Sequence, residues 1–214
     1  MRVIAGAAGG IRLDAPKTNV RPTMDRVKAA IFSSLGHEII GARVLDLFAG
    51  TGALGIEALS RGAASVLFVD ENSAAIAAIE RNLARTKLEG RVRKQDVFAF
   101  LRSEQTREPF KIIFADPPYE KTKSGGEFTR LLLQDTQLVA ALEPSGIFVL
   151  EKRPSEQMWP MPLWNIIRAR AYGATEVLFL QRAPSFQAKS RKPVMKPIAS
   201  PRDVSTPLDM TKAE

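Results

Sequence analysis

The chain of 214 residues contains no cysteine and only one histidine, His37. Disulfide frameworks, thiolate nucleophiles, iron–sulfur clusters and Cys/His zinc sites are therefore excluded, and we expect no metal. His37 follows Gly36, and we interpret it as a residue at a helix end rather than as a catalytic base. No apolar run approaches the roughly 20 residues of a membrane span, and the N-terminus lacks the features of a signal peptide. We therefore expect a soluble, cytoplasmic protein without a membrane partner.

Acidic residues are outnumbered, because 31 Lys and Arg stand against 23 Asp and Glu and give a net charge of +8. Residues 1–28 carry a local charge of +4 and residues 183–214 carry +3, which leaves +1 for the rest. Basic ends on a near-neutral body are typical of polyanion binding, although solvated charge unrelated to any partner is the alternative. The stretch 183–214 is also rich in proline, and we expect a disordered basic tail.

Short apolar runs alternate with helical patterns along the middle of the chain. The runs lack strict period-two alternation, which is typical of strands buried on both faces; they are 43–48, 65–70, 111–116 and 146–151, with a shorter one at 91–96. Helical patterns occupy 53–62, which Gly62 closes, 73–88, with Ser73 as a possible N-cap, and 127–142, which stops before Pro144. The predicted fold is α/β, with a mostly parallel sheet, helices on both faces and an antiparallel C-terminal strand pair turning near Gly173.

The length favours a single domain over residues 1–182. Within it we distinguish a core, 37–182, from an N-terminal extension, 1–36. The extension is predicted to contain a small β-hairpin around Gly9–Gly10 and a helix with Thr23 as an N-cap candidate.

The stretch "DLFAGTGALG" follows the first predicted core strand. Gly50, Gly52 and Gly55 form a tight turn into a helix, where glycine lets a ligand approach the backbone closely. Asp70 ends the next strand and is placed to bind ribose hydroxyls. The pattern favours a nucleoside-containing cofactor over a purely structural turn, but a dinucleotide fingerprint would look much the same.

The stretch "KIIFADPPYEK", 111–121, ends a strand in Asp116, Pro117, Pro118 and Tyr119. The prolines lack N–H donors, so the backbone presents carbonyl acceptors from a stiff bend. Asp116 and the Pro117 carbonyl can accept the two N–H bonds of an exocyclic amine, while Tyr119 stacks on the ring that carries it. The alternative is a turn that Asp116 merely caps; downstream of a nucleoside loop we favour the amine socket.

With these motifs the chain resembles class I S-adenosylmethionine-dependent methyltransferases that methylate amines, in which the fold is a Rossmann-like sheet. It is similar in particular to the bacterial 16S ribosomal RNA guanine-N2 methyltransferases of the RsmD family. The resemblance rests on "RVIAG", "RPTMDRVKAAIFSSL", "VLDLFAGTGALGIEALSRGA", "DPPY" and "YGATEVLFLQR", which occur in order over residues 2–182.

The resemblance implies roles for individual residues. Asp116, Pro117, Pro118 and Tyr119 would hold the guanine. Those expected to line S-adenosylmethionine are Thr23, Asp46, Phe48, Ala49, Gly50, Gly52, Asp70, Asp96 and Val97, although Thr23 and Asp96 could be helix caps only. Those expected near the RNA are Arg2, Arg12, Arg21 and Arg26 in the extension, and Lys121 and Lys123 in a loop after the Asp-Pro-Pro-Tyr motif.

The implied reaction is direct methyl transfer to the N2 amine of one guanine in 16S rRNA, with the RNA inside a small-subunit assembly particle. We expect a monomer, because no additional apolar face in the sequence argues for a dimer. The absence of cysteine agrees, because methylation at pyrimidine C5 commonly uses a cysteine nucleophile. The alternatives are an adenine-N6 methyltransferase on DNA or RNA, a nicotinamide-dependent dehydrogenase, and a non-catalytic RNA-binding assembly factor.

Overall fold

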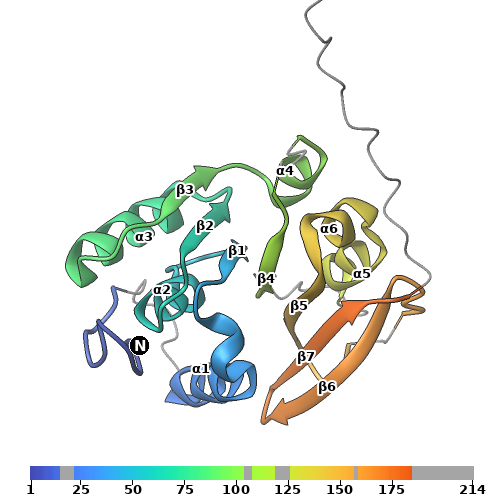
Figure 1. The fold of residues 1–214 in the computed structure, drawn as a ribbon, viewed down its shortest axis with the longest axis horizontal. Helices are drawn as coiled ribbons and strands as arrows, with labels where there is room; N and C mark the ends of the chain where they lie inside the picture. Colours follow the sequence, from blue (N-terminus) through green and yellow to red (C-terminus); the bar gives the residue numbers. More distant parts are fainter. Residues whose placement is uncertain (15–21, 104–107, 119–125, 157–158, 185–214) are drawn as a thin grey trace, which may run out of the picture.

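The structure, a computed structural model, describes residues 1–14, 22–103, 108–118, 126–156 and 159–184, with the backbone alone at 22–24. Seven strands form one sheet in the order β3-β2-β1-β4-β5-β7-β6 (Figure 1). The strands are β1 (Arg43–Leu47), β2 (Ser65–Asp70), β3 (Arg91–Lys94), β4 (Phe110–Ala115), β5 (Leu142–Lys152), β6 (Trp164–Tyr172) and β7 (Thr175–Arg182). The first five are parallel, whereas β7 is antiparallel to both β5 and β6. The predicted fold class is confirmed.

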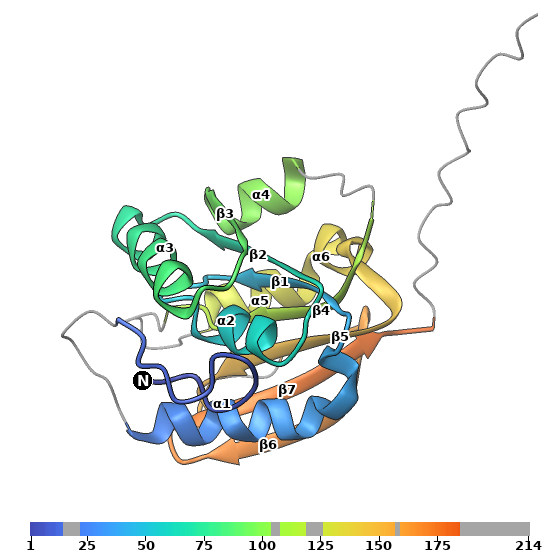
Figure 2. The ribbon, with the colours of Figure 1, turned by 60° about the vertical axis from the view of Figure 1, so that its left-hand side comes forward.

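Helices cover both faces of the sheet (Figures 1 and 2). They are α1 (Pro22–Leu35), the 3-10 helix η1 (Gly36–Ile39), α2 (Ala53–Ser60), α3 (Ser73–Thr86), α4 (Val97–Ser103), α5 (Glu127–Gln134) and α6 (Thr136–Ala141). One core cluster joins α1, α2, α3 and the N-terminal hairpin to one face, and a second joins α4, α5 and α6 to the other. No helix in these described ranges is long and apolar enough to cross a membrane.

Two helix predictions need correction. The pattern at 127–142 forms two helices, because the Asp135 carboxylate accepts hydrogen bonds from the N–H groups of Gln137 (2.7 Å) and Leu138 (3.0 Å) and starts a new helix. The N-cap of α3 is Asn72 and not Ser73, since the Asn72 side chain accepts from the Ala74 N–H at 2.8 Å. Side chains that bond their own backbone make such local breaks.

The N-terminal hairpin has one bridge instead of a ladder of paired residues. A single antiparallel bridge joins Arg2 and Arg12, and the chain between them loops over α2. Gly6 allows this approach, because a Cβ there would lie 1.8 Å from the Ser60 carbonyl oxygen. The Ala7 N–H then donates to that oxygen at 2.7 Å. Figure 2 shows the loop lying between α2 and α1.

Candidate active site

The candidate site lies at the carboxyl ends of the central strands. In the register of β1 and β4, Leu47 pairs with Ala115. The glycine loop after β1 and the Asp-Pro-Pro segment after β4 therefore begin side by side. In parallel sheets covered by helices, this edge is where ligands bind.

The glycine loop is fixed to the end of β2. Asp70 Oδ2 accepts the Gly50 N–H at 2.8 Å, and Asp70 Oδ1 accepts the Asn72 N–H at 2.8 Å. The Ala49 N–H donates to the Val69 carbonyl at 3.1 Å. Each carboxylate oxygen can accept a second hydrogen bond, so Asp70 keeps the capacity to bind ribose hydroxyls that the sequence suggested.

Asp46 lies beneath this loop and is only 2% exposed. Its Oδ2 accepts the Gly55 N–H at 2.9 Å, which ties the end of β1 to the first turn of α2. Gly55 serves packing rather than ligand approach, because a Cβ there would lie 2.2 Å from the ring of Phe68. Burial raises the pKa of Asp46 to about 8; Asp116 and Asp70 add to the increase, and the Gly55 hydrogen bond opposes it.

Three half-buried phenylalanine rings line the same edge. Phe48 follows β1 with a positive φ of 54°, and its ring centroid lies 5.6 Å from that of Phe128 and 6.2 Å from that of Phe98. Phe98 and Phe128 are stacked, with centroids 6.1 Å apart. Phe48 was predicted as a site residue and the other two were not, since they come from α4 and α5. Together they form an apolar surface suited to a planar ring.

Asp116 is half-buried at the exit of β4, with Pro117 buried and Pro118 exposed beside it. Within the described ranges, its carboxyl group has no hydrogen bond and no ion pair. Burial raises its pKa to about 6. The Asp116 carboxyl group therefore makes no polar contact that holds the described fold together. Tyr119, Lys121 and Lys123 lie outside the described residues.

Glu151, near the end of β5, was not predicted as a site residue. Burial raises its pKa well above the usual value, and Asp116 and then Asp46 add to this effect. Asp46 lies in β1, Glu151 lies in β5 and Asp116 directly follows β4 between them, and the three carboxyl groups influence one another electrostatically. The signal in the sequence was an apolar run ending in an acid, "GIFVLE", which repeats the pattern that ends in Asp116.

Two other predicted cofactor residues have structural roles in this state. Asp96 is exposed, and its Oδ1 accepts the Ala99 N–H at 2.7 Å, so it caps α4 as the alternative interpretation held. The Val97 side chain is buried in the core. Contact with an adenine at this position remains a prediction. Of Thr23 only the backbone is described; it lies within α1, which begins one residue earlier, at Pro22, so the prediction of Thr23 as the N-cap is wrong.

Among the predicted RNA-binding residues, Arg2, Arg12 and Arg26 are exposed, and Arg21 lies outside the described ranges. Arg2 and Arg12 face each other across the hairpin bridge. The Arg2 backbone N–H donates to Asp25 Oδ1 of α1 at 3.3 Å. The hairpin and α1 therefore form one basic unit beside the glycine loop.

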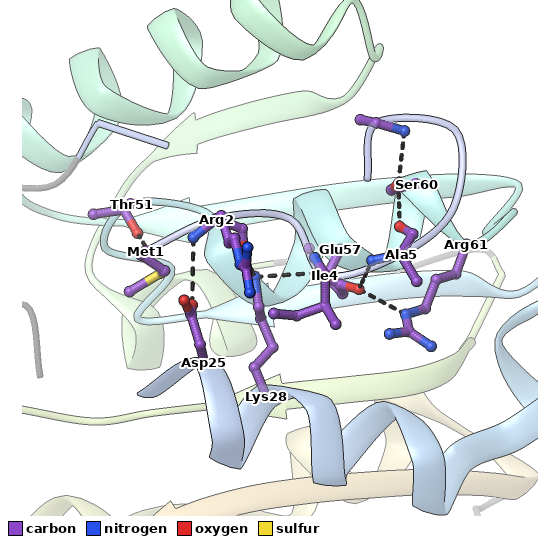
Figure 3. Close-up of polar contacts among 12 residues, drawn as sticks. Met1, Arg2, Ile4, Ala5, Asp25, Lys28, Thr51, Glu57, Ser60 and Arg61 are labelled. Carbon is purple, nitrogen blue, oxygen red and sulfur yellow. Dashed lines mark hydrogen bonds and ion pairs between the residues drawn. The ribbon is translucent and has the colours of Figure 1, made fainter. Parts of the chain in front are cut away.

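A buried carboxylate, Glu57 of α2, anchors this unit (Figure 3). Glu57 is fully buried, and its Oε2 lies 3.1 Å from Lys28 Nζ while its Oε1 lies 2.7 Å from Arg61 Nε. The same oxygens accept the backbone N–H groups of Ile4 (2.7 Å) and Ala5 (3.1 Å). Burial lowers the pKa of Lys28, and Glu57 opposes this decrease. The extension is thereby fixed to the helix that follows the cofactor loop.

A separate groove of about 660 Å³ opens at the opposite, amino-terminal edge of the sheet. Its lining includes His37, Arg43, Lys111 and Glu143. Lys111 Nζ pairs with Glu38 at 2.9 Å, and the Arg43 guanidinium lies over the Phe110 ring at 4.2 Å. The groove is thus remote from the strand exits.

The strand order and the glycine loop define a class I methyltransferase fold, with the Asp-Pro-Pro segment at its carboxyl edge. A family model described as Conserved hypothetical protein 95 matches residues 1–181, and the chain belongs to this family. The resemblance to the RsmD family is thereby confirmed.

Relatives and solved structures agree with this assignment. The chain is 38% identical over 188 residues to "Putative rRNA methyltransferase YlbH" of Bacillus subtilis, which covers 85% of this chain and 99% of that protein. It is 33% identical to Ribosomal RNA small subunit methyltransferase D of Escherichia coli, and the match covers 85% of this chain and 90% of that protein. The solved structure of "Putative methyltransferase yhhF" from Escherichia coli is 33% identical in sequence, with a TM-score of 0.71. The match covers 85% of this chain and 97% of that one.

Proposed function

We propose that this protein transfers a methyl group from S-adenosylmethionine to the exocyclic N2 amine of one guanine in the 16S rRNA. The observation that carries the proposal is the Asp116 carboxyl, which has no partner in the described ranges and follows β4 directly beside the glycine loop of β1. The names of the two relatives support rRNA methylation as the general activity. The choice of guanine N2 over adenine N6 rests on the resemblance to the RsmD family, because the Asp-Pro-Pro-Tyr motif suits either amine.

The site suits a cofactor that combines a nucleoside with positive charge. Asp70 retains acceptor capacity at the end of β2, next to the glycine loop. Asp46, Asp116 and Glu151 bring three carboxyl groups to the same edge, where a cationic ligand would relieve their mutual repulsion. When bound, S-adenosylmethionine supplies an electrophilic methyl group on a positively charged sulfur.

The Asp116 carboxylate would accept one N–H of the target amine, and the Pro117 carbonyl would accept the other. This orientation directs the nitrogen lone pair at the methyl carbon and stabilises the positive charge that develops on nitrogen. Guanine's amine is delocalised into its ring, so exclusion of water and stacking on Tyr119 are expected to help.

The extension would bind the RNA. Arg2, Arg12 and Arg26 give it exposed positive charge, and the Glu57 network fixes it beside the site. Structured RNA is recognised largely through phosphates, shape and splayed-out bases. We assign residues 1–36 to RNA binding, 37–182 to catalysis and 183–214 to a basic tail, with a monomer acting on a small-subunit particle.

The test is nucleoside mass spectrometry on small ribosomal subunits that lack the modification, incubated with purified protein and isotopically labelled S-adenosylmethionine. We expect labelled N2-methylguanosine. Labelled N6-methyladenosine would overturn the assignment to guanine but keep an amine-methylating role for Asp116. No label with intact cofactor binding would overturn the proposed substrate.

A further inference from the structure

Glu151 is an acidic residue at the carboxyl edge, and the proposed methyl transfer gives it no part in holding the target amine. In the register of β4 and β5, Ala115 pairs with Leu150, so Asp116 and Glu151 come next on neighbouring strands. Parallel strands lie about 4.8 Å apart, and residues side by side project to the same face. That face carries Phe114 and Val149, two residues earlier on each strand. The two carboxyl groups are therefore adjacent.

The surroundings of Glu151 contain no compensating cation in the part of the chain that the structure describes. The charges acting on it are those of Asp116 and Asp46. Lys152, the next residue, projects to the opposite face, and its Nζ binds Glu176 Oε2 at 2.9 Å. Arg153 is exposed at the end of β5. Two adjacent carboxyl groups without a cation cannot easily both be ionised, and such pairs commonly hold one proton between them.

We propose that Glu151 is a positioning residue of the methyl-transfer site, which shares one proton with Asp116 and so orients the carboxylate that receives the target amine. The inference rests on the proposed function. To that function it adds an account of how the Asp116 carboxylate is oriented. No other residue in the described ranges makes a hydrogen bond to this carboxylate. A protonated Glu151 donates to one Asp116 oxygen and leaves the other for the amine.

The proton balance of the reaction is then complete. The nitrogen lone pair forms the new N–C bond, the S–C bond breaks, and its electron pair stays on sulfur. The nitrogen is positively charged at that point and loses one N–H proton. The Asp116–Glu151 pair, which held one proton, accepts this second one and later releases it to solvent. The pair gives the proton an immediate destination inside the site.

The first experiment measures single-turnover methylation between pH 5 and 9. We compare the unchanged protein with Glu151→Gln, Glu151→Ala and Glu143→Gln, a control at the other end of β5. Asp116 ionises while Glu151 is still protonated, so the acidic limb of the Glu151→Gln profile should stay where it is in the unchanged protein. The rate of the unchanged protein should fall at the higher pH at which the pair loses its shared proton, and Glu151→Gln, which has no such proton to lose, should lack this alkaline limb. Glutamine keeps an N–H donor, so its plateau should fall far less than that of Glu151→Ala, which should lose about 10²-fold.

The control should follow the unchanged protein. An alkaline limb that persists unchanged in Glu151→Gln would overturn the proposal, as would a Glu151→Ala rate equal to that of the control. If Glu151→Ala does not fold, the Glu151→Gln profile decides.

The second experiment needs neither cofactor nor RNA. Carboxyl carbon-13 NMR follows the titration of Asp116 and Glu151 in the full chain, in Glu151→Gln and in Asp116→Asn. Asp116→Asn should lower the apparent pKa of Glu151, because Asp116 contributes to its increase, and Glu151→Gln should leave a single titration step at Asp116. These changes in a protein that methylates no RNA would support the pair and refute the proposed function. Methylation without these changes would refute the pair alone.

Discussion

Two groups of carboxylates that the fold shields from solvent have opposite surroundings: Glu57 is fully buried, whereas Asp116 and Glu151 are half-buried. Glu57 in α2 is matched by two cations, Lys28 and Arg61, and by two backbone N–H groups of the hairpin. Asp116 and Glu151 at the strand exits have no hydrogen bond or ion pair within the described ranges, and burial raises the pKa of both.

A buried carboxylate with all its partners fixes structure, because every group around it would be left unsatisfied by its loss. A buried carboxylate without partners is a cost to the folded state, and such residues concentrate where a ligand supplies what is missing. The contrast separates Glu57, which anchors the extension, from the carboxyl groups of the proposed methyl-transfer site. Each prediction below changes a residue of one group or tests its surroundings.

The largest effect is expected from Asp116→Asn. The amide has no negative charge and cannot accept the proton that the methylated nitrogen loses, so the rate should fall by about 10²-fold or more. Single-turnover methylation measures the rate, and calorimetry measures cofactor binding and the melting temperature. Cofactor affinity should be largely retained, and the melting temperature should be unchanged or higher. A rate close to that of the unchanged protein would contradict the assignment.

Glu57→Ala should act on stability in the opposite way. It leaves Lys28, which is 3% exposed, without its carboxylate and removes the acceptor of two hairpin N–H groups. We expect a loss of about 3 to 5 kcal/mol in the free energy of unfolding. Urea denaturation measures it, with Glu80→Ala on the exposed side of α3 as a control. Equal losses in both variants would show that the Glu57 network does not anchor the extension.

The next prediction concerns the pH dependence of stability. The pKa of Asp46 is raised to about 8 in the folded state, so between its unfolded value of 3.8 and about 8 the folded state binds more protons. The folded state therefore loses stability as pH rises through this window. Urea denaturation at pH 5 and pH 8 should show a smaller difference in Asp46→Asn than in the unchanged protein. An identical difference would mean that Asp46 is not held protonated.

The smallest effect is expected at Asp96, an exposed carboxylate with one backbone partner. Asp96→Ala removes the cap of α4 and should cost about 1 kcal/mol, whereas Asp96→Asn should keep the cap. Thermal denaturation and cofactor titration of both variants separate the two roles. Full stability with weakened cofactor binding in Asp96→Asn would assign the carboxylate to the ligand.

Much of the sheet was predictable because its strands are continuous apolar runs. The run 65–70 matches β2 in full, whereas β5 begins at Leu142 and includes Pro144, which we had placed beyond a helix. That early start depends on pairing with β4, where Phe110 aligns with Leu142 across an irregular register. The local sequence gives no information about pairing between strands that are distant along the chain.

The site was predictable where chemistry follows a strand end. Asp46, Asp70 and Asp116 stand out for this reason, and Glu151 follows the same rule but lacks a neighbouring motif. Glu57 gave no signal, since it resembles an ordinary solvated position of a short helix. Its burial depends on α1 and the hairpin, which come from much earlier in the chain.

The position of β7 has a consequence for synthesis on the ribosome. Among the strands that the structure describes, β7 is the last to be made, yet it lies inside the sheet between β5 and β6 and pairs Val177 with Glu151. A nascent chain that stops before Thr175 leaves the edge of β5 open and Glu151 without its cover. An unfinished chain therefore lacks the burial that raises the pKa of Glu151, and under the proposed mechanism the site is complete only when β7 has been added.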